Sequence, residues 1–264
     1  MMLLFLTWKL FVYLKKRHLY VKTQKMSFPD SYKKILQNIV YYQHLPDELK
    51  EKIHKKILFF IHTKEFVGVH TKVTDEMKVI IAFFACMMVV NMDDEYYDEL
   101  VTILIYPNNM VMDDVSVNNG IYSQERLILQ GQSIGDAIVI AWDEAKEEAY
   151  HLRHHNVIIH ELAHVLDFEE GMANGVPLLQ RSRYDAWSKV LYKRYNELNE
   201  KVKYNSNLDK YNLIGEYAST NKAEFFAIVS ELFFLNPKSL KEHFPDLYSE
   251  FSIYYCLDPV TYMI

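Results

Sequence analysis

The pentapeptide HELAH at residues 160–164 constrains this chain more than any other feature of its sequence. Two histidines four residues apart on a helix project about 40° from each other, so both imidazoles can reach one metal ion. Zinc takes nitrogen ligands at about 2.0–2.1 Å, and Glu161 beside them can act as general base toward a zinc-bound water. The flanking residues contain neither Gly nor Pro. The sequence therefore predicts a helix over about 156–168 whose His160 and His164 hold Zn²⁺.

A hydrolytic zinc site needs a third protein ligand, which the neighbouring sequence does not supply. Asp167 and Glu170 occupy the positions where the longer motif HExxHxxGxxH has Gly and His. Downstream, Glu224 and Glu231 lie seven residues apart on one face of an apolar helical segment. Carboxylates there are costly unless paired or metal-bound, so spacing alone makes either one a candidate. Asn221 offers Glu224 a second role, in a helix cap.

Three histidines precede the motif, at positions 151, 154 and 155. They lie on a polar segment before the predicted helix, and we expect them to be solvated and separate from the metal site. Tyr217 is one of twenty tyrosines, and without further information it is predicted to be an ordinary half-buried phenol.

Hydrophobic periodicity predicts a helix-dominated α+β domain over residues 31–264 with a small mixed β-sheet. Beside the motif helix, the predicted helices are 31–43, 46–62, 74–90, 183–203, 222–235 and 238–255. Short β-branched runs between turn signals predict strands at 100–106, 121–129 and 137–142, with a hairpin turn at 117–120.

Residues 1–30 differ from the rest of the chain. Residues 1–34 carry a net charge of +7, which leaves −13 on the remainder. The first fourteen residues are apolar, but as a helix they reach only about 21 Å, short of the ~30 Å bilayer core. Two interpretations stay open: residues 1–25 contact the cytoplasmic face of a membrane, or they are an extension that precedes a true start at Met26.

Composition excludes several classes. The 264 residues are 50% apolar, which is enough for a sizeable core. The net charge is −6 and no basic stripe runs through the body of the chain, which argues against nucleic-acid binding. Cys86 and Cys256 match no metal or redox spacing, so we expect a reducing, cytoplasmic location.

Several segments resemble the Mlc titration factor A family of bacterial zinc peptidases. They include residues 156–167, Gly171 through Pro177, and Tyr217 through Phe234. The resemblance covers roughly residues 35–258. It implies a helix-rich, zincin-like metallopeptidase fold similar to the catalytic domain of anthrax lethal factor, with aminopeptidase-like activity on peptide substrates.

The resemblance also implies roles for single residues. The family's third zinc ligand falls on Glu224, and its active-site tyrosine falls on Tyr217. Glu231 then becomes a candidate for orienting a ligand histidine, and Asp167 is a second such candidate. The founding member binds a repressor of sugar uptake, so the alternative function is a regulatory protein that sequesters a transcriptional repressor, with catalysis secondary.

Overall fold

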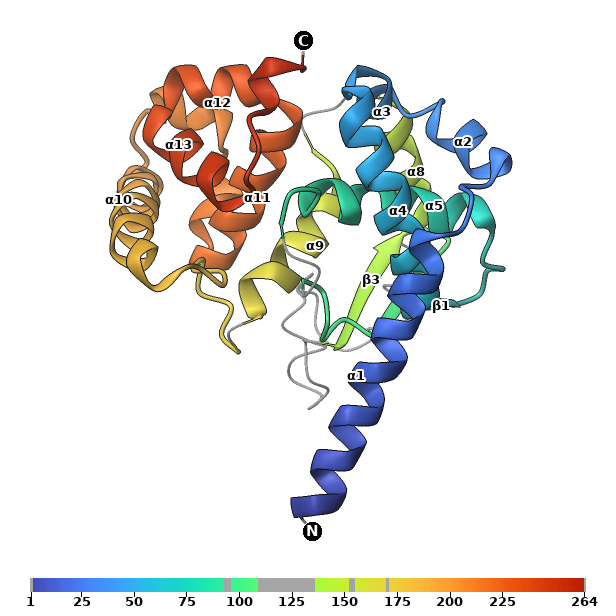
Figure 1. Cartoon of the computed structure of the whole chain (residues 1–264). Helices are drawn as coiled ribbons and strands as arrows, with labels where there is room; N and C mark the ends of the chain where they lie inside the picture. Colours follow the sequence, from blue (N-terminus) through green and yellow to red (C-terminus); the bar gives the residue numbers. More distant parts are fainter. Residues whose placement is uncertain (1, 93–95, 109–135, 152–154, 170, 264) are drawn as a thin grey trace.

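The motif-bearing helix lies at the centre of the protein. A computed structural model describes residues 2–92, 96–108, 136–151, 155–169 and 171–263. Figure 1 shows α9 (Val157–Phe168) with the earlier helices and the sheet on one side and the later helices on the other. Helix α11 (Lys222–Leu235) packs directly against α9. This pairing brings together the two segments that carry the predicted ligands.

The remaining elements agree with a helix-dominated chain. The other helices are α1 (Met2–Gln24), α2 (Asp30–Leu36), α3 (Val40–His44), α4 (Asp47–Thr63), α5 (Asp75–Met88), α8 (Trp142–Tyr150), α10 (Tyr184–Lys203), α12 (Pro237–His243) and α13 (Pro245–Tyr254). Short 3₁₀ helices are η2 (Arg181–Arg183), η3 (Asp209–Leu213), η4 (Glu216–Ser219) and η5 (Pro259–Thr261).

The described strands form a parallel sheet, so the prediction of a mixed sheet is wrong for this part of the chain. The order is β1 (Glu65–Gly68), β2 (Thr102–Tyr106) and β3 (Ala137–Ala141), with both pairs parallel. Parallel neighbours need a crossover connection, and α5 supplies it between β1 and β2. The predicted strand 121–129 and hairpin 117–120 lie outside the described residues.

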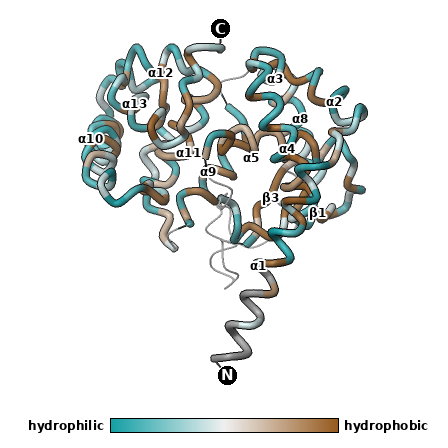
Figure 2. The backbone as a smooth tube through the Cα atoms, viewed as in Figure 1, coloured by the Kyte–Doolittle hydropathy of each residue, from teal (hydrophilic) through white to brown (hydrophobic). Residues whose placement is uncertain are grey.

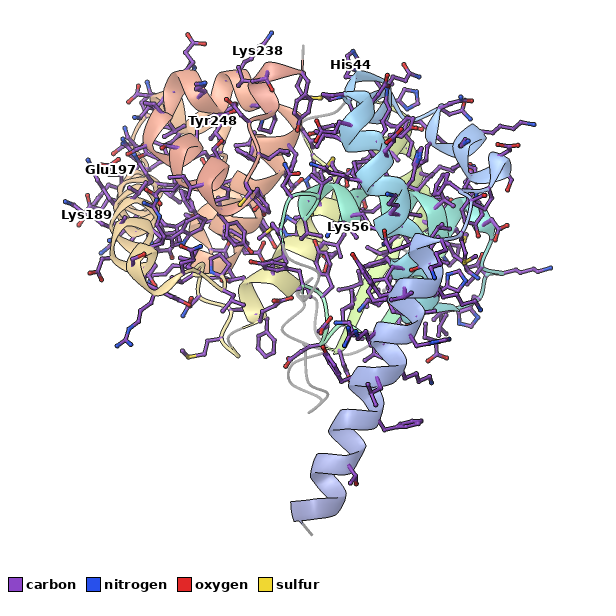
Figure 3. The ribbon with its side chains drawn as sticks, in the orientation of Figure 1. His44, Lys56, Lys189, Glu197, Lys238 and Tyr248 are labelled. Atoms are coloured by element: carbon purple, nitrogen blue, oxygen red, sulfur yellow. The ribbon has the colours of Figure 1, made fainter. Side chains whose placement is uncertain are left out.

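The core is centred on α5, which contacts both α4 and α9. Its N-cap is Thr74, whose hydroxyl accepts a hydrogen bond from the Met77 amide at 3.3 Å. Almost every later residue of this helix is buried. Figure 2 shows hydrophobic residues concentrated on α5, α9 and α11, whereas α10 carries many polar residues. Figure 3 places Lys189 and Glu197 on α10 at the periphery. The site helices therefore have a rigid apolar support.

Two predicted helices are interrupted. The segment 238–255 forms α12 and α13, which are separated at Phe244 with φ −138° and ψ 64°. Pro245 begins α13, and the residue before a proline is disfavoured in helical geometry. The segment 31–43 likewise divides into α2 and α3. Neither β1 nor α8 was predicted, and α8 proves important for the site.

Helix α1 projects from the body at its N-terminal end (Figure 1). Its C-terminal half docks on α4, where the Tyr20 and Phe59 rings meet edge to face at 5.5 Å between centroids. Lys16 also pairs with Asp98, in the segment before β2. Phe11 and Leu14 are exposed. None of the helices in the described residues is long and apolar enough to cross a bilayer.

Candidate metal centre

Helix α9 presents the two motif histidines from one face. It begins at the buried Asn156, whose side-chain oxygen accepts a hydrogen bond from the Ile159 amide at 3.0 Å. One turn later His160 and His164 converge, with 3.1 Å between their Nε2 atoms. The cap fixes where the helix starts, and the four-residue spacing then sets the two imidazoles side by side.

Helix α11 supplies the third group through a similar cap. The Asn221 side chain accepts a hydrogen bond from the Glu224 amide at 2.9 Å, so Glu224 lies in the first turn. Its carboxylate oxygens lie 3.1 Å from His160 Nε2 and 3.5 Å from His164 Nε2. The sequence offered two roles for Glu224, one in the helix cap and one as a ligand beside the histidines. In the structure Glu224 occupies both positions.

The spacing of the three groups fits a small metal ion. Ligands at about 2.0–2.1 Å in tetrahedral geometry are separated by about 3.3 Å. Here the two Nε2 atoms are 3.1 Å apart, Glu224 Oε2 is 3.1 Å from His160 Nε2, and Glu224 Oε1 is 3.5 Å from His164 Nε2. The Oε2 atom of Glu224 is buried without a hydrogen-bond partner among the described residues, although His160 Nε2 is close to it. A cation at the centre would satisfy all three groups.

The electrostatics of the centre also favour a cation. Burial disfavours the charged imidazolium of His160, yet its contacts with Glu224 and Glu231 raise the pKa of His160 to about 10. Burial likewise opposes ionisation of Glu224, but the two motif histidines outweigh it and hold its pKa well below the usual range. The carboxylates therefore favour a positive charge between His160, His164 and Glu224.

Glu231 lies behind His160, two turns after Glu224 on the same face of α11. Its Oε1 atom is 2.7 Å from His160 Nδ1, and its Oε2 atom accepts the Asn156 amide at 2.7 Å. The side chain is only 2% exposed. A carboxylate that accepts the Nδ1 proton leaves the Nε2 lone pair free to face a metal. Glu231 is therefore placed to orient His160.

Asp167 lies further along α9 and binds the chain that follows the helix. Its Oδ2 atom accepts the Gly175 amide at 2.8 Å, and burial raises the pKa of Asp167 to about 7. Gly175 has φ +78°, and a Cβ atom there would lie 2.7 Å from the Lys222 carbonyl oxygen. Only glycine fits this position, and the chain at Gly175 therefore passes close to the start of α11. Through its hydrogen bond to Gly175, Asp167 helps to hold the end of α9 near the start of α11.

The prediction that the preceding histidines lie apart from the metal site is wrong for His155. His155 is half exposed, but its Nδ1 atom pairs with Glu231 Oε2, and its ring lies 6.0 Å from that of His160. His151 is exposed, and its Nδ1 contacts the Glu147 carbonyl oxygen at 3.0 Å. His154 lies outside the described residues.

A cavity of about 580 Å³ opens beside the centre. His160 and Glu161 line it together with Tyr217 from η4, and Leu213 and Ile228 contribute apolar wall. Tyr217 is 57% exposed. The cavity brings Glu161 and Tyr217 to the same space as His160.

Comparison with known proteins identifies the chain. The family described as glucose-regulated metallo-peptidase M90 matches residues 13–256. The chain belongs to this family. A protein of Synechocystis sp. is 33% identical over 83% of the chain and 81% of its own length. Proteins named Mlc titration factor A are 30% identical in Cronobacter sakazakii and 28% identical in Klebsiella pneumoniae, with 82–83% of each chain covered.

Membership of a metallo-peptidase family implies a metal, and the His160, His164 and Glu224 group is a candidate place for it. The M90 family chain carries a second candidate group that sequence reasoning missed, formed by Glu144, Glu148 and His155. No motif joins these residues. Two of them lie on α8, which the sequence analysis did not predict, and the only available signal was the His-rich segment before α9.

Proposed function

We propose that the chain is a zinc-dependent peptidase whose ion would be held by His160, His164 and Glu224. The observation that carries this proposal is the set of 3.1–3.5 Å separations between their ligand atoms, at the edge of a cavity that Glu161 lines. When bound, zinc supplies a water of lowered pKa and a Lewis acid for the scissile carbonyl.

Two residues of the cavity would move or stabilise charge. Glu161 accepts the proton of the attacking water and delivers it to the departing amine. Tyr217 donates its phenolic hydrogen to the oxyanion that develops on the carbonyl oxygen. Support for both roles comes from their shared cavity with His160 and from the family resemblance.

The substrate is proposed to be a peptide, cleaved in an aminopeptidase-like manner. A segment of extended peptide could pair with a neighbouring strand. Among the described strands, β3 is an edge of the sheet and contacts α9, which supports it as the pairing strand.

A comparison of two variants tests the peptidase proposal. Glu161→Gln should keep the metal and lose about 10²- to 10⁴-fold in peptide hydrolysis, because the general base is removed. His160→Ala should lose the metal itself. The measurements are metal content and turnover of a panel of aminoacyl and internally quenched peptides. Parent-like activity in Glu161→Gln would exclude the mechanism.

A regulatory role is the second candidate. Relatives from several bacteria bear the name Mlc titration factor A, which favours a transcriptional repressor as partner. If sequestration is the function, Glu161→Gln should still bind such a repressor with unchanged affinity. Loss of repressor control in cells that parallels loss of hydrolysis would instead favour catalysis.

We also propose that residues 1–25 contact an anionic membrane surface from the cytoplasmic side. Exposed Phe11 and Leu14 and the basic residues Lys15 and Arg17 on α1 support this proposal. Sedimentation with vesicles that contain or lack anionic lipid tests it, with the Lys15→Glu/Arg17→Glu variant as comparison. Equal sedimentation of parent and variant with anionic vesicles would contradict it.

A further inference from the structure

The cavity beside the metal centre has an apolar wall as well as the polar groups proposed for the reaction. Five aliphatic side chains form this wall, and they are Val157, Leu213, Ile214, Ile228 and Leu232. They come from the start of α9, the end of η3 and the second half of α11. Glu161, on α9, and Tyr217, on η4, line the same cavity. A peptide bound for cleavage would therefore meet the apolar wall.

Ile228 is the part of the wall that lies level with the ligand histidine. It lies between Glu224, which contacts His160 Nε2, and Glu231, which contacts His160 Nδ1. The side chains of Glu224 and Ile228 are four residues apart, so they lie on one face of α11 about 6 Å apart along the helix axis. A substrate whose carbonyl group approaches His160 therefore has an aliphatic side chain about one helical turn away.

The burial pattern of α11 shows that Ile228 faces an opening. Between Ala223 and Phe234, every residue of the helix is buried except Glu224 and Ile228. Val157 and Leu213 are likewise only partly buried, although both pack against the core. Aliphatic surface that faces a cavity stays in contact with solvent, and a ligand that covers it with apolar groups of its own is favoured. The wall is therefore suited to an apolar group of the ligand.

The opposite side of the wall is joined to Tyr217 by a glycine turn. Leu213 ends η3, and Gly215 with φ +85° separates it from η4, which carries Tyr217. Glycine adopts this conformation without strain. The Tyr195 hydroxyl on α10 donates to the Ser219 carbonyl oxygen at 3.2 Å and so holds η4 in place. The apolar wall and the phenol of Tyr217 are therefore held at fixed positions in one short stretch of chain.

We propose that the apolar wall is a specificity pocket for an apolar side chain of the peptide substrate. The inference rests on the proposed peptidase function and adds the class of residue that the cavity selects. The selected side chain belongs to one of the two residues that flank the scissile bond, the one that contributes the carbonyl or the one that contributes the nitrogen. A leucine or phenylalanine at the selected position would cover Ile228 and Leu213.

Two series of internally quenched peptides test the proposal on the metal-loaded full chain. One series varies the residue that contributes the scissile carbonyl, and the other varies the residue that contributes the nitrogen, with glycine, leucine, phenylalanine, lysine or glutamate in turn. Leucine should exceed glycine by about 10- to 100-fold in kcat/KM, the range expected for burial of its side chain. The series that responds identifies the selected residue. Equal rates for glycine and leucine in both series, or a preference for lysine or glutamate over leucine, would overturn the pocket.

Variants of Ile228 change the size of the pocket in opposite directions. Ile228→Ala enlarges it and should raise the ratio of phenylalanine to leucine by about 10-fold, whereas Ile228→Phe fills it and should lower that ratio by a similar factor. A general loss of stability cannot produce two opposite shifts. An unchanged ratio in both variants would exclude Ile228 and its wall as the source of selectivity.

Leu235→Ala provides the matched control. Leu235 is another partly buried aliphatic side chain of α11 that packs against the core, and it is not among the described residues that line the cavity. The variant should therefore keep the parent's preference among the peptides. A shift as large as that of Ile228→Ala would show that the preference reflects the packing of α11 and would overturn the pocket.

A binding measurement separates failure of the pocket from failure of the proposed function. If none of the peptides is hydrolysed, the peptidase proposal fails, and calorimetry on metal-loaded Glu161→Gln still compares their affinities. Tighter binding of the leucine peptide than of the glycine peptide, with the difference lost on adding Ile228→Phe, would support the pocket. Equal affinities, or no binding of either peptide, would reject it.

Discussion

The carboxylate of Glu231 contacts two histidines, His155 and His160, that line the same cavity. It contacts Nδ1 of His160 with one oxygen and Nδ1 of His155 with the other, and it also accepts the Asn156 amide. Because it lies behind the rings, it can fix their orientation without meeting a metal. Glu224 has the opposite position, in front of both motif histidines.

Because of these positions, we expect removal of Glu224 and removal of Glu231 to lower the zinc affinity by different amounts. Glu224→Ala should abolish or greatly weaken zinc retention, because a ligand is lost. Glu231→Gln should weaken zinc affinity by about 10–100-fold, as changes behind a ligand histidine do. Competition with a zinc chelator measures both affinities. The reverse order would assign the third ligand to Glu231.

Tyr217 provides a second prediction at this scale. A phenol that donates only to the developing oxyanion contributes to the transition state and little to substrate binding. Tyr217→Phe should lower kcat by roughly 10²- to 10³-fold with KM and zinc content nearly unchanged. Because the residue is 57% exposed, little stability should be lost. Normal turnover in this variant would remove Tyr217 from the mechanism.

At the scale of elements, the metal centre depends on two helices that both begin with asparagine caps. Asn156 caps α9 and Asn221 caps α11. The side-chain oxygen of each accepts a hydrogen bond from the backbone amide three residues further along the chain. The caps set the register of the histidine pair and of Glu224. The start of α11 therefore has a direct effect on the third ligand.

Replacing the cap of α11 should affect stability and metal affinity together. Asn221→Ala should destabilise the protein by about 1 kcal/mol and weaken zinc binding, because the first turn that carries Glu224 would fray. Asn221→Asp retains a side-chain acceptor and should stay near the parent in both. Thermal melts and zinc titrations provide the measurement. Identical behaviour of the two variants would show that the cap does not position Glu224.

The sequence predicted elements well where local signals agree. The helices near 156–168 and 222–235 have an asparagine cap and an uninterrupted apolar period, and both were confirmed within a residue. Strand direction was missed because it depends on a crossover through α5, which no local pattern encodes. The break at Phe244 was also missed, although Pro245 signals it.

The candidate site shows the same division between local and long-range information. His160, Glu161 and His164 follow from one motif on one helix, whereas the approach of Glu224 requires α11 to pack on α9. His155 was misjudged because its partner Glu231 is distant in sequence. A contact between two residues that are distant in the sequence does not show in the hydrophobic periodicity of either segment.

At the scale of the whole molecule, α9 joins the N-terminal helices and sheet to the C-terminal helices (Figure 1). Just after α9, Glu169 accepts the Tyr97 amide at 2.6 Å and so links the end of the motif helix to the segment before β2. Among the described residues, Asp98, Glu99 and Lys64 are charged groups that act on it. This contact makes the stability of the fold depend on pH.

Burial is the main reason that the pKa of Glu169 is raised from 4.5 to about 7 in the folded protein. Between these values the folded state binds more protons than the unfolded state, so this contribution to stability is complete below about pH 4.5 and is lost as the pH rises through 7. Glu169→Gln keeps an acceptor for the Tyr97 amide but does not titrate. Relative to this variant, the parent should lose about 1–3 kcal/mol of unfolding free energy between pH 4.5 and 8. Denaturant titrations of both proteins at several pH values measure the difference, and a difference that stays constant with pH would show that Glu169 ionises alike in the folded and unfolded states.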